Sequence, residues 1–153
     1  MGLIDFVRAA GEKIFGTSEA AASPTTDETV LSKRATALEA HVGKLGLPVE
    51  GLKIKVADEV AYVKGTVQTQ EIREKVVLAV GNVEGIASVE DRLEVTNPQP
   101  EARYYTVAKG DTLSKIAKEM YGDANKYPQI FEANKPMLGH PDKIYPGQVL
   151  RIP

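Results

Sequence analysis

The sequence predicts an α+β protein: a small sandwich of order helix, strand, strand, helix, strand, followed by a second unit of strands and helices. Three observations support this prediction. Two runs, LKIKV at 52–56 and AYVKGTV at 61–67, alternate between apolar and polar residues, which is typical of strands with one buried face. Segments with helical spacing of apolar residues flank these runs. A stretch with two prolines, 97–102, then precedes a different pattern, as a semi-rigid linker does.

The composition limits the possible functions. The chain has 153 residues, of which 42% are hydrophobic and 26% charged, as in ordinary soluble proteins. The formal net charge is −2, and Lys and Arg are spread along the chain, so we expect no basic patch and no nucleic-acid partner. The absence of cysteine excludes disulfides and Cys-ligated zinc. No apolar run approaches the length of a membrane span.

Residues 1–24 are expected to form an N-terminal amphipathic helix and a polar connection. Within MGLIDFVRAAGEKIFG, apolar residues recur at helical spacing, namely Leu3, Val7, Ala10 and Ile14. This stripe could lie on a membrane surface, but its polar face mixes acids and bases, so packing on the protein's own body is favoured. The segment lacks the basic n-region of a secretory signal, and charges interrupt its apolar run. A cytoplasmic protein is therefore expected.

The first unit is expected to span residues 25–96. A capping box from Thr25 to Glu28 can open its first helix, and Gly46 is placed to end it. The two alternating runs then form a hairpin across residues 57–59.

A second helix, capped by Thr69, is expected to end at Gly81. The third strand follows, with Val89, Leu93 and Val95 facing inward. Its outward-facing residues are expected to be Ser88, Glu90, Arg92 and Glu94. This order of elements places the helices on one face of a sheet.

The second unit, 103–153, is expected to begin and end with short strands, near 104–107 and 148–152. Two helices lie between them. Asp111 or Thr112 can cap the first of these helices. The second is expected to start near Asn125, because Pro128 is tolerated only in a first turn.

The sequence contains no pattern that favours catalysis. Its two histidines, His41 and His140, lie on a helix edge and in a turn. No nucleophile elbow, P-loop or HExxH motif is present. Neighbouring carboxylates such as Glu90 and Asp91 point to opposite faces of a strand and cannot form an acid–base pair. We therefore expect no enzyme.

The stretch VGNVEGI, residues 80–86, places two glycines four positions apart where a helix ends. Such a corner is usually an ordinary turn. It is also a place where unpaired helix carbonyls can converge on a cation. The sequence lacks the acidic loop that Ca²⁺ requires, whereas K⁺ can be held by neutral backbone carbonyls. Both interpretations stay open on the residues alone, with the N-terminal helix as the lid of an ion site.

The second unit strongly resembles the LysM module, a β-α-α-β domain. Its motifs match at YxV, GDTL, the Ile-Ala pair, EAN and IYPGQVLRIP, which occupy Tyr105–Val107, Gly110–Leu113, Ile116–Ala117, Glu132–Asn134 and Ile144–Pro153. The first unit resembles the BON domain, on its spaced glycines, alternating strands and terminal strand. In this order, with MGLIDFVRAAGEK in front, the chain is similar to the family of small cytoplasmic bacterial potassium-binding proteins.

That resemblance implies a K⁺ site built from backbone carbonyls, a change of conformation on binding, and a role as an ion sensor. Rb⁺ and Cs⁺ are expected to substitute for K⁺. The main-chain oxygens implied are those of Val7, Ala10, Glu12, Gly81, Val83 and Ile86.

The alternative is glycan binding, which LysM modules commonly perform on peptidoglycan. The implied groove residues are Gly110, Asp111, Thr112, Leu113, Asn134 and Met137. Without an export signal, access to wall polymer is not expected, so we favour a LysM module that contacts the BON domain of the same chain. A monomer without membrane or nucleic-acid partners is expected.

Overall fold

The computed structural model describes residues 2–15 and 25–153. The predicted connection over residues 16–24 lies outside them. The strands are β1 (Gly2–Asp5), β2 (Glu50–Ala57), β3 (Val60–Thr69), β4 (Ser88–Asn97), β5 (Arg103–Thr106) and β6 (Val149–Ile152). The helices are α1 (Glu28–Lys44), α2 (Gln70–Gly81), α3 (Leu113–Tyr121) and α4 (Tyr127–Ala133), with a 3-10 helix at Ala124–Lys126.

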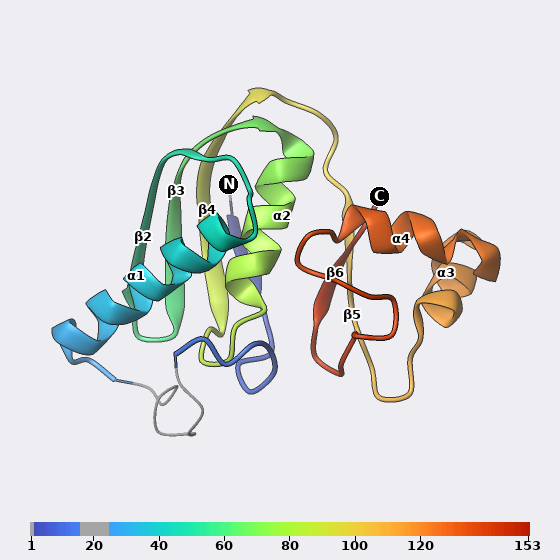
Figure 1. Ribbon diagram of the computed structural model, residues 1–153, viewed down its shortest axis with the longest axis horizontal. Helices are drawn as coiled ribbons and strands as arrows, with labels where there is room; N and C mark the ends of the chain where they lie inside the picture. The colour runs from blue at the N-terminus through green and yellow to red at the C-terminus, as the bar shows by residue number, and fades with distance from the viewer. Residues whose placement is uncertain (1, 16–24) are drawn as a thin grey trace.

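The first four strands form one sheet of order β1-β4-β3-β2. Strands β2 and β3 are the predicted antiparallel hairpin, and Ala57 pairs with Val60 across its turn. Strands β3 and β4 are parallel, so the chain must cross over between them, and α2 is that crossover. Figure 1 shows α1 and α2 together on one face of this sheet. The predicted α+β class is confirmed.

The cap of α1 differs from the predicted capping box. Asp27 is the N-cap, and its carboxylate accepts hydrogen bonds from the amides of Thr29 at 2.9 Å and Val30 at 3.3 Å. Thr25 instead accepts from the Asp27 amide at 3.1 Å. A carboxylate at this position satisfies two unpaired amides and also complements the positive end of the helix, which a hydroxyl does not.

The prediction of an N-terminal helix is wrong, because the segment forms β1, antiparallel to β4. The apolar residues follow a period of two rather than 3.6. Ile4 packs on the core and Phe6 is buried, whereas Leu3 and Val7 are 62% and 44% exposed. The outer edge of β4 offers a row of unpaired peptide groups, and an alternating segment satisfies them as a strand.

The facing of β4 was predicted only in part. Val89 and Leu93 are buried as expected, but Ser88 is also buried, because it lies at the strand start between β1 and β3. Asp91 shares the inner face, where Arg73 of α2 pairs with it at 2.7 Å. A buried carboxylate is tolerated there because a guanidinium compensates its lost hydration.

The second unit pairs β5 with β6 in an antiparallel ribbon and packs α3 and α4 against it, with a hydrophobic cluster of its own. Thr112 caps α3, accepting from the Lys115 amide at 3.1 Å. Pro128 lies in the first turn of α4, as predicted. In Figure 1 the unit lies beside α2, on the side away from α1.

We predict that Gly81→Ala destabilises the fold by roughly 1–3 kcal/mol, because a methyl group at this position overlaps the ring of Phe6. Gly43→Ala is the matched control, since open space surrounds Gly43 in α1 and alanine favours a helix by about 0.5–1 kcal/mol. Urea unfolding measures both values. Faster hydrogen exchange at the Phe6 amide, which donates to Ala87 at 2.9 Å, locates the damage. If Gly81→Ala proves as stable as Gly43→Ala, the close packing of Gly81 against Phe6 is contradicted.

Candidate metal centre

Two backbone segments far apart in the sequence run side by side at one end of the sheet. They are residues 6–12, which follow β1, and residues 82–87, which follow α2. Four main-chain hydrogen bonds join them: Phe6 N to Ala87 O and Gly85 N to Arg8 O, both at 2.9 Å, and Glu12 N to Asn82 O and Glu84 N to Glu12 O, both at 3.0 Å. The structure therefore brings together the two segments that the resemblance implied, but as a strand and turn rather than as a helical lid.

The six implied carbonyl oxygens differ in their main-chain hydrogen bonds. Three accept one such bond each, Val7 from Ala10 and Glu12 from Glu84 at 3.0 Å, and Val83 from Ile86 at 3.1 Å. Within residues 2–15 and 25–153, no main-chain hydrogen bond ends on the oxygens of Ala10, Gly81 or Ile86. Because a carbonyl oxygen has two lone pairs, each of the six keeps at least one lone pair that no main-chain hydrogen bond uses.

The environment of this corner suits a cation. Helix α2 ends at Gly81 and has no basic residue in its last turn, so the negative end of its dipole is uncompensated by its own side chains. Val83 and Ile86 are fully buried, which limits the access of water. Carbonyl dipoles attract a cation more strongly in a site from which water is excluded than they do in water.

Two glycines of the corner have a positive φ, and the third does not. Gly11 has φ 115° and Gly85 has φ 105°, a region that other residues rarely adopt. A Cβ on Gly11 would also lie 2.6 Å from the carbonyl carbon of Asn82. At Gly81, by contrast, close packing against Phe6 excludes a side chain, as described above.

The side chain of Asn82 joins this corner to the second unit. Its amide nitrogen donates to the carbonyl oxygen of Val149 at 2.8 Å, and its oxygen accepts from the Val149 amide at 2.8 Å. Asn82 thereby pairs with β6 as a neighbouring strand would. The same residue holds Glu12 through its main-chain oxygen.

A buried ion pair forms a second junction. Glu74 of α2 is 1% exposed, and its carboxylate meets Arg151 of β6 at 2.7 Å. The same carboxylate accepts from the Ala102 amide at 2.8 Å and from the Gln70 side chain at 3.3 Å. With these partners the buried charge is compensated, so breaking one of them is costly.

A loop of the second unit also covers the N-terminal turn. A Cβ on Gly147 would lie 2.7 Å from the Cβ of Ala10 and 3.2 Å from that of Val7. Burial, followed by the negative charge of Glu12, raises the pKa of Tyr145 in the same loop to about 12. The candidate ion site therefore lies against both units.

The implied glycan residues separate into two groups. Thr112 and Leu113 line a cleft of about 400 Å³ with Tyr127 and His140. Asp111 instead holds its own loop. Hydrogen bonds from the Ala108 amide and from the hydroxyl of Tyr105, at 2.7 Å, lower its pKa.

Gly110 lies in the same loop with φ 86° and does not line the cleft. The last two implied glycan residues lie away from the cleft. Asn134 is 1% exposed, and its side chain bonds the backbone of Ile130 at 2.7 Å and of Arg151 at 2.7 and 2.9 Å. The sulfur of Met137 contacts the Asn82 side chain at 3.3 Å. The structure thus gives Asn134 and Met137 structural roles and does not bring them to a groove.

Sequence reasoning missed Asn82, Glu74 and Arg151 as functional candidates. A signal existed for Glu74, which is a charge on the helix face that also presents Val77 and Leu78. Nothing local marks Asn82 or Arg151, because their partners lie far away in the chain. In the part of the chain that the structure describes, no cluster of three or more His, Asp or Glu side chains could hold a metal ion, and no helix is long and apolar enough to cross a membrane.

We predict a pH effect centred on His41, whose imidazole lies 3.8 Å from the carboxylate of Glu12. Burial lowers the pKa of His41 below its ordinary 6.5, Glu12 opposes this shift, and Lys44 adds to it. The unfolded chain therefore binds the proton first, so His41 contributes stability above its unfolded pKa and loses it as the pH falls. Urea unfolding at several pH values between about 7.5 and 5.5 should show a steeper loss in the wild type than in His41→Gln. Equal pH profiles would refute this assignment.

The sequence matches two family models, the BON domain over residues 28–97 and the LysM domain over residues 105–153. Both expected resemblances are confirmed. Two further relatives match only in part. An uncharacterised protein of Deinococcus radiodurans is 53% identical over 49 residues, which is 19% of its length. A Mycobacterium tuberculosis protein named as esterase Rv1288 is 47% identical over 53 residues, but these make up only 11% of that enzyme.

A third relative matches along its whole length. The potassium binding protein Kbp of Escherichia coli O6:H1 is 47% identical over 154 residues, covering 100% of this chain and 99% of that protein. The chain therefore belongs to the Kbp family, with a BON domain followed by a LysM domain.

Proposed function

We propose that this protein binds one K⁺ ion in the cytoplasm and acts as a sensor of that ion. The ligands are the main-chain oxygens of Val7, Ala10, Glu12, Gly81, Val83 and Ile86. The observation that supports the proposal is the hydrogen-bonded pairing of residues 6–12 with residues 82–87, which brings the two segments that carry these oxygens side by side near the end of α2. The name of the full-length relative supports the choice of ion.

The chemistry of the donors favours K⁺ over a divalent ion. Ca²⁺ and Mg²⁺ require several carboxylates or tightly held waters, and the ligand set here is neutral. K⁺ gives up its hydration shell more readily to a ring of carbonyl dipoles, as in channel filters. The carboxylate of Glu12 contacts His41 at 3.8 Å, and the ligand proposed for this residue is its main-chain oxygen.

Binding should order the N-terminal segment. Four residue pairs join β1 to β4, and beyond β1 the turn at residues 8–12 is held by hydrogen bonds to the corner, by the ion pair of Arg8 with Glu59 and by packing against Gly147. Without the ion, converging carbonyl oxygens repel one another, and this repulsion favours release of the turn. A ligand that binds only the ordered state shifts the population toward it.

We predict that K⁺ raises the thermal unfolding midpoint and that Na⁺ at the same ionic strength raises it far less, because a carbonyl cage must contract at a cost to hold the smaller ion. The gain in stability is about 2.7 kcal/mol when K⁺ exceeds its Kd a hundredfold. Rb⁺ and Cs⁺ should substitute at least partly. Differential scanning calorimetry in the four chlorides measures this series.

Two variants locate the site in the same experiment. Deleting residues 2–12 should abolish the difference between K⁺ and Na⁺, whereas Glu12→Ala should keep it, since only the backbone of Glu12 is used. If the truncated protein still responds to K⁺, the ion binds elsewhere. If the full-length protein responds equally to Na⁺ and K⁺, a K⁺-selective site is excluded.

We further propose that the LysM domain stabilises the ion-bound corner, rather than binding peptidoglycan. The double hydrogen bond between Asn82 and Val149 and the packing of Gly147 on Ala10 support this role. Docking of the LysM domain and closure of the ion site would then favour one another, as linkage requires.

We predict that Asn82→Ala weakens K⁺ binding and speeds proteolysis of the linker at residues 97–102, because it leaves the peptide groups of Val149 without partners. Asn125→Ala, at an exposed position of the LysM domain, is the control and should change neither. Isothermal titration with KCl and limited proteolysis measure the two effects. Normal K⁺ affinity in Asn82→Ala, or firm retention of the wild type on insoluble peptidoglycan, would count against this role.

A further inference from the structure

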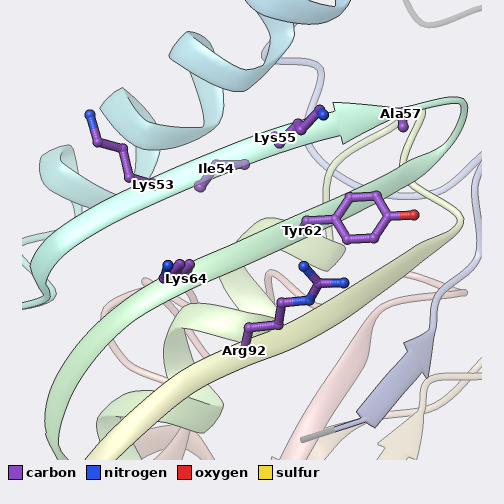
Figure 2. A pocket seen from close by; sticks show the side chains of 7 residues that line it. All are labelled: Lys53, Ile54, Lys55, Ala57, Tyr62, Lys64 and Arg92. Carbon is purple, nitrogen blue, oxygen red and sulfur yellow. The ribbon is translucent and has the colours of Figure 1, made fainter.

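The outer face of the four-stranded sheet, opposite to α1 and α2, carries a cluster of basic side chains. Figure 2 shows Lys53 and Lys55 on β2, Tyr62 and Lys64 on β3, and Arg92 on β4, all around one shallow hollow. The hollow measures about 420 Å³. The three lysines and Arg92 are exposed. From the even spread of Lys and Arg along the sequence we expected no basic patch. The fold nevertheless brings these basic residues together, so that expectation is wrong.

The register of the strands sets like charges directly opposite one another. Lys64 pairs with Lys53 on one side and with Arg92 on the other. Cross-strand neighbours of like charge destabilise a sheet. Sequence choices that oppose the fold in this way are expected at functional sites, where a ligand compensates for them.

Acidic side chains neutralise the row only in part: Glu90 and Glu94 share the outer face of β4 with Arg92, whereas the lysines outnumber them. Within the described residues, Lys53, Lys55 and Lys64 form no ion pair, whereas lysines elsewhere do, for example Lys75 with Glu71 at 3.0 Å. Arg92 alone is partnered, by Glu90 at 3.2 Å, and its guanidinium lies over the ring of Tyr62 at 5.2 Å. The patch is thus positive within a chain of net charge −2.

The face, rather than the free edge of β2, is the accessible surface at this point. The amide of Ile54 points out of the edge and donates to the carboxylate of Glu39 in α1 at 3.0 Å. That bond occupies a donor which an added strand would need, so an extended peptide is hindered from pairing with β2 there.

We propose that this patch binds a small soluble molecule that carries a diphosphate or triphosphate group. Neighbouring strands lie about 4.8 Å apart and alternate residues about 6.8 Å apart, so four positive residues fall within roughly 12 Å of one another. A compact polyphosphate concentrates its charge on that scale. An extended acidic peptide would place only about two carboxylates over the patch, and a nucleic-acid strand would need a longer basic stripe.

The experiment is isothermal titration with sodium tripolyphosphate at low, fixed ionic strength and constant KCl, so that any K⁺ site stays equally filled. We expect saturable binding that weakens roughly tenfold or more in Lys53→Gln and in Lys64→Gln. Lys118→Gln, an exposed lysine of the LysM domain, is the matched control and should bind like the wild type. ATP in place of tripolyphosphate should bind to the same patch and show the same loss in the variants.

A second measurement separates a binding site from a merely basic surface. Removing the like charge at position 64 should raise the thermal midpoint of the free protein by about 1–3 °C, even though binding of tripolyphosphate is weakened. The proposal is overturned if tripolyphosphate does not bind, if Lys64→Gln and Lys118→Gln bind it equally, or if Lys64→Gln lowers the midpoint. It is also overturned if polyglutamate or single-stranded oligouridylate binds more tightly than tripolyphosphate.

Discussion

Asn82 is the residue on which the arrangement of the molecule depends. Its main-chain oxygen holds the turn at Glu12, and its side chain holds the backbone of Val149 through two hydrogen bonds. It is 5% exposed, so in the folded protein these polar groups depend on their protein partners rather than on water, and removing one partner leaves a buried group unpaired. The N-terminal turn, the end of α2 and the LysM domain are therefore linked through one side chain and its peptide group.

A buried charge joins the two domains. Glu74 is compensated by Arg151 of the LysM domain and by the amide of Ala102 at the end of the linker. Such a pair contributes little net stability compared with apolar packing, but it strongly penalises any arrangement that leaves the carboxylate alone. Apolar residues also meet between the domains: Val149 joins the main cluster, and Tyr104 and Met137 pack against it. The contacts between the domains thus combine apolar packing with buried polar groups that require specific partners.

The two faces of the sheet carry different kinds of residue. The inner face is apolar apart from compensated groups such as Asp91, because α1 and α2 cover it. The outer face is open, and there charge rather than packing decides which residues are tolerated. Water screens the repulsion among Lys53, Lys64 and Arg92. These residues are therefore tolerated although the strand register holds them close together. The candidate ion site at the end of the sheet and the basic patch on its outer face therefore lie on different parts of the same sheet.

The sequence by itself determined the elements whose signals are local. Alternation predicted the β2–β3 hairpin, Thr69 and Gly81 bounded α2, and the motifs from Tyr105 onward identified the LysM domain. It also named the two segments of the candidate ion site, through the family resemblance. Only the tertiary structure decided that residues 2–5 form a strand, since a short apolar segment fits either period until the edge of β4 is available to pair with it. The partners of Asn82 and Glu74 and the basic row likewise depend on contacts between residues distant in the chain, which no local pattern records.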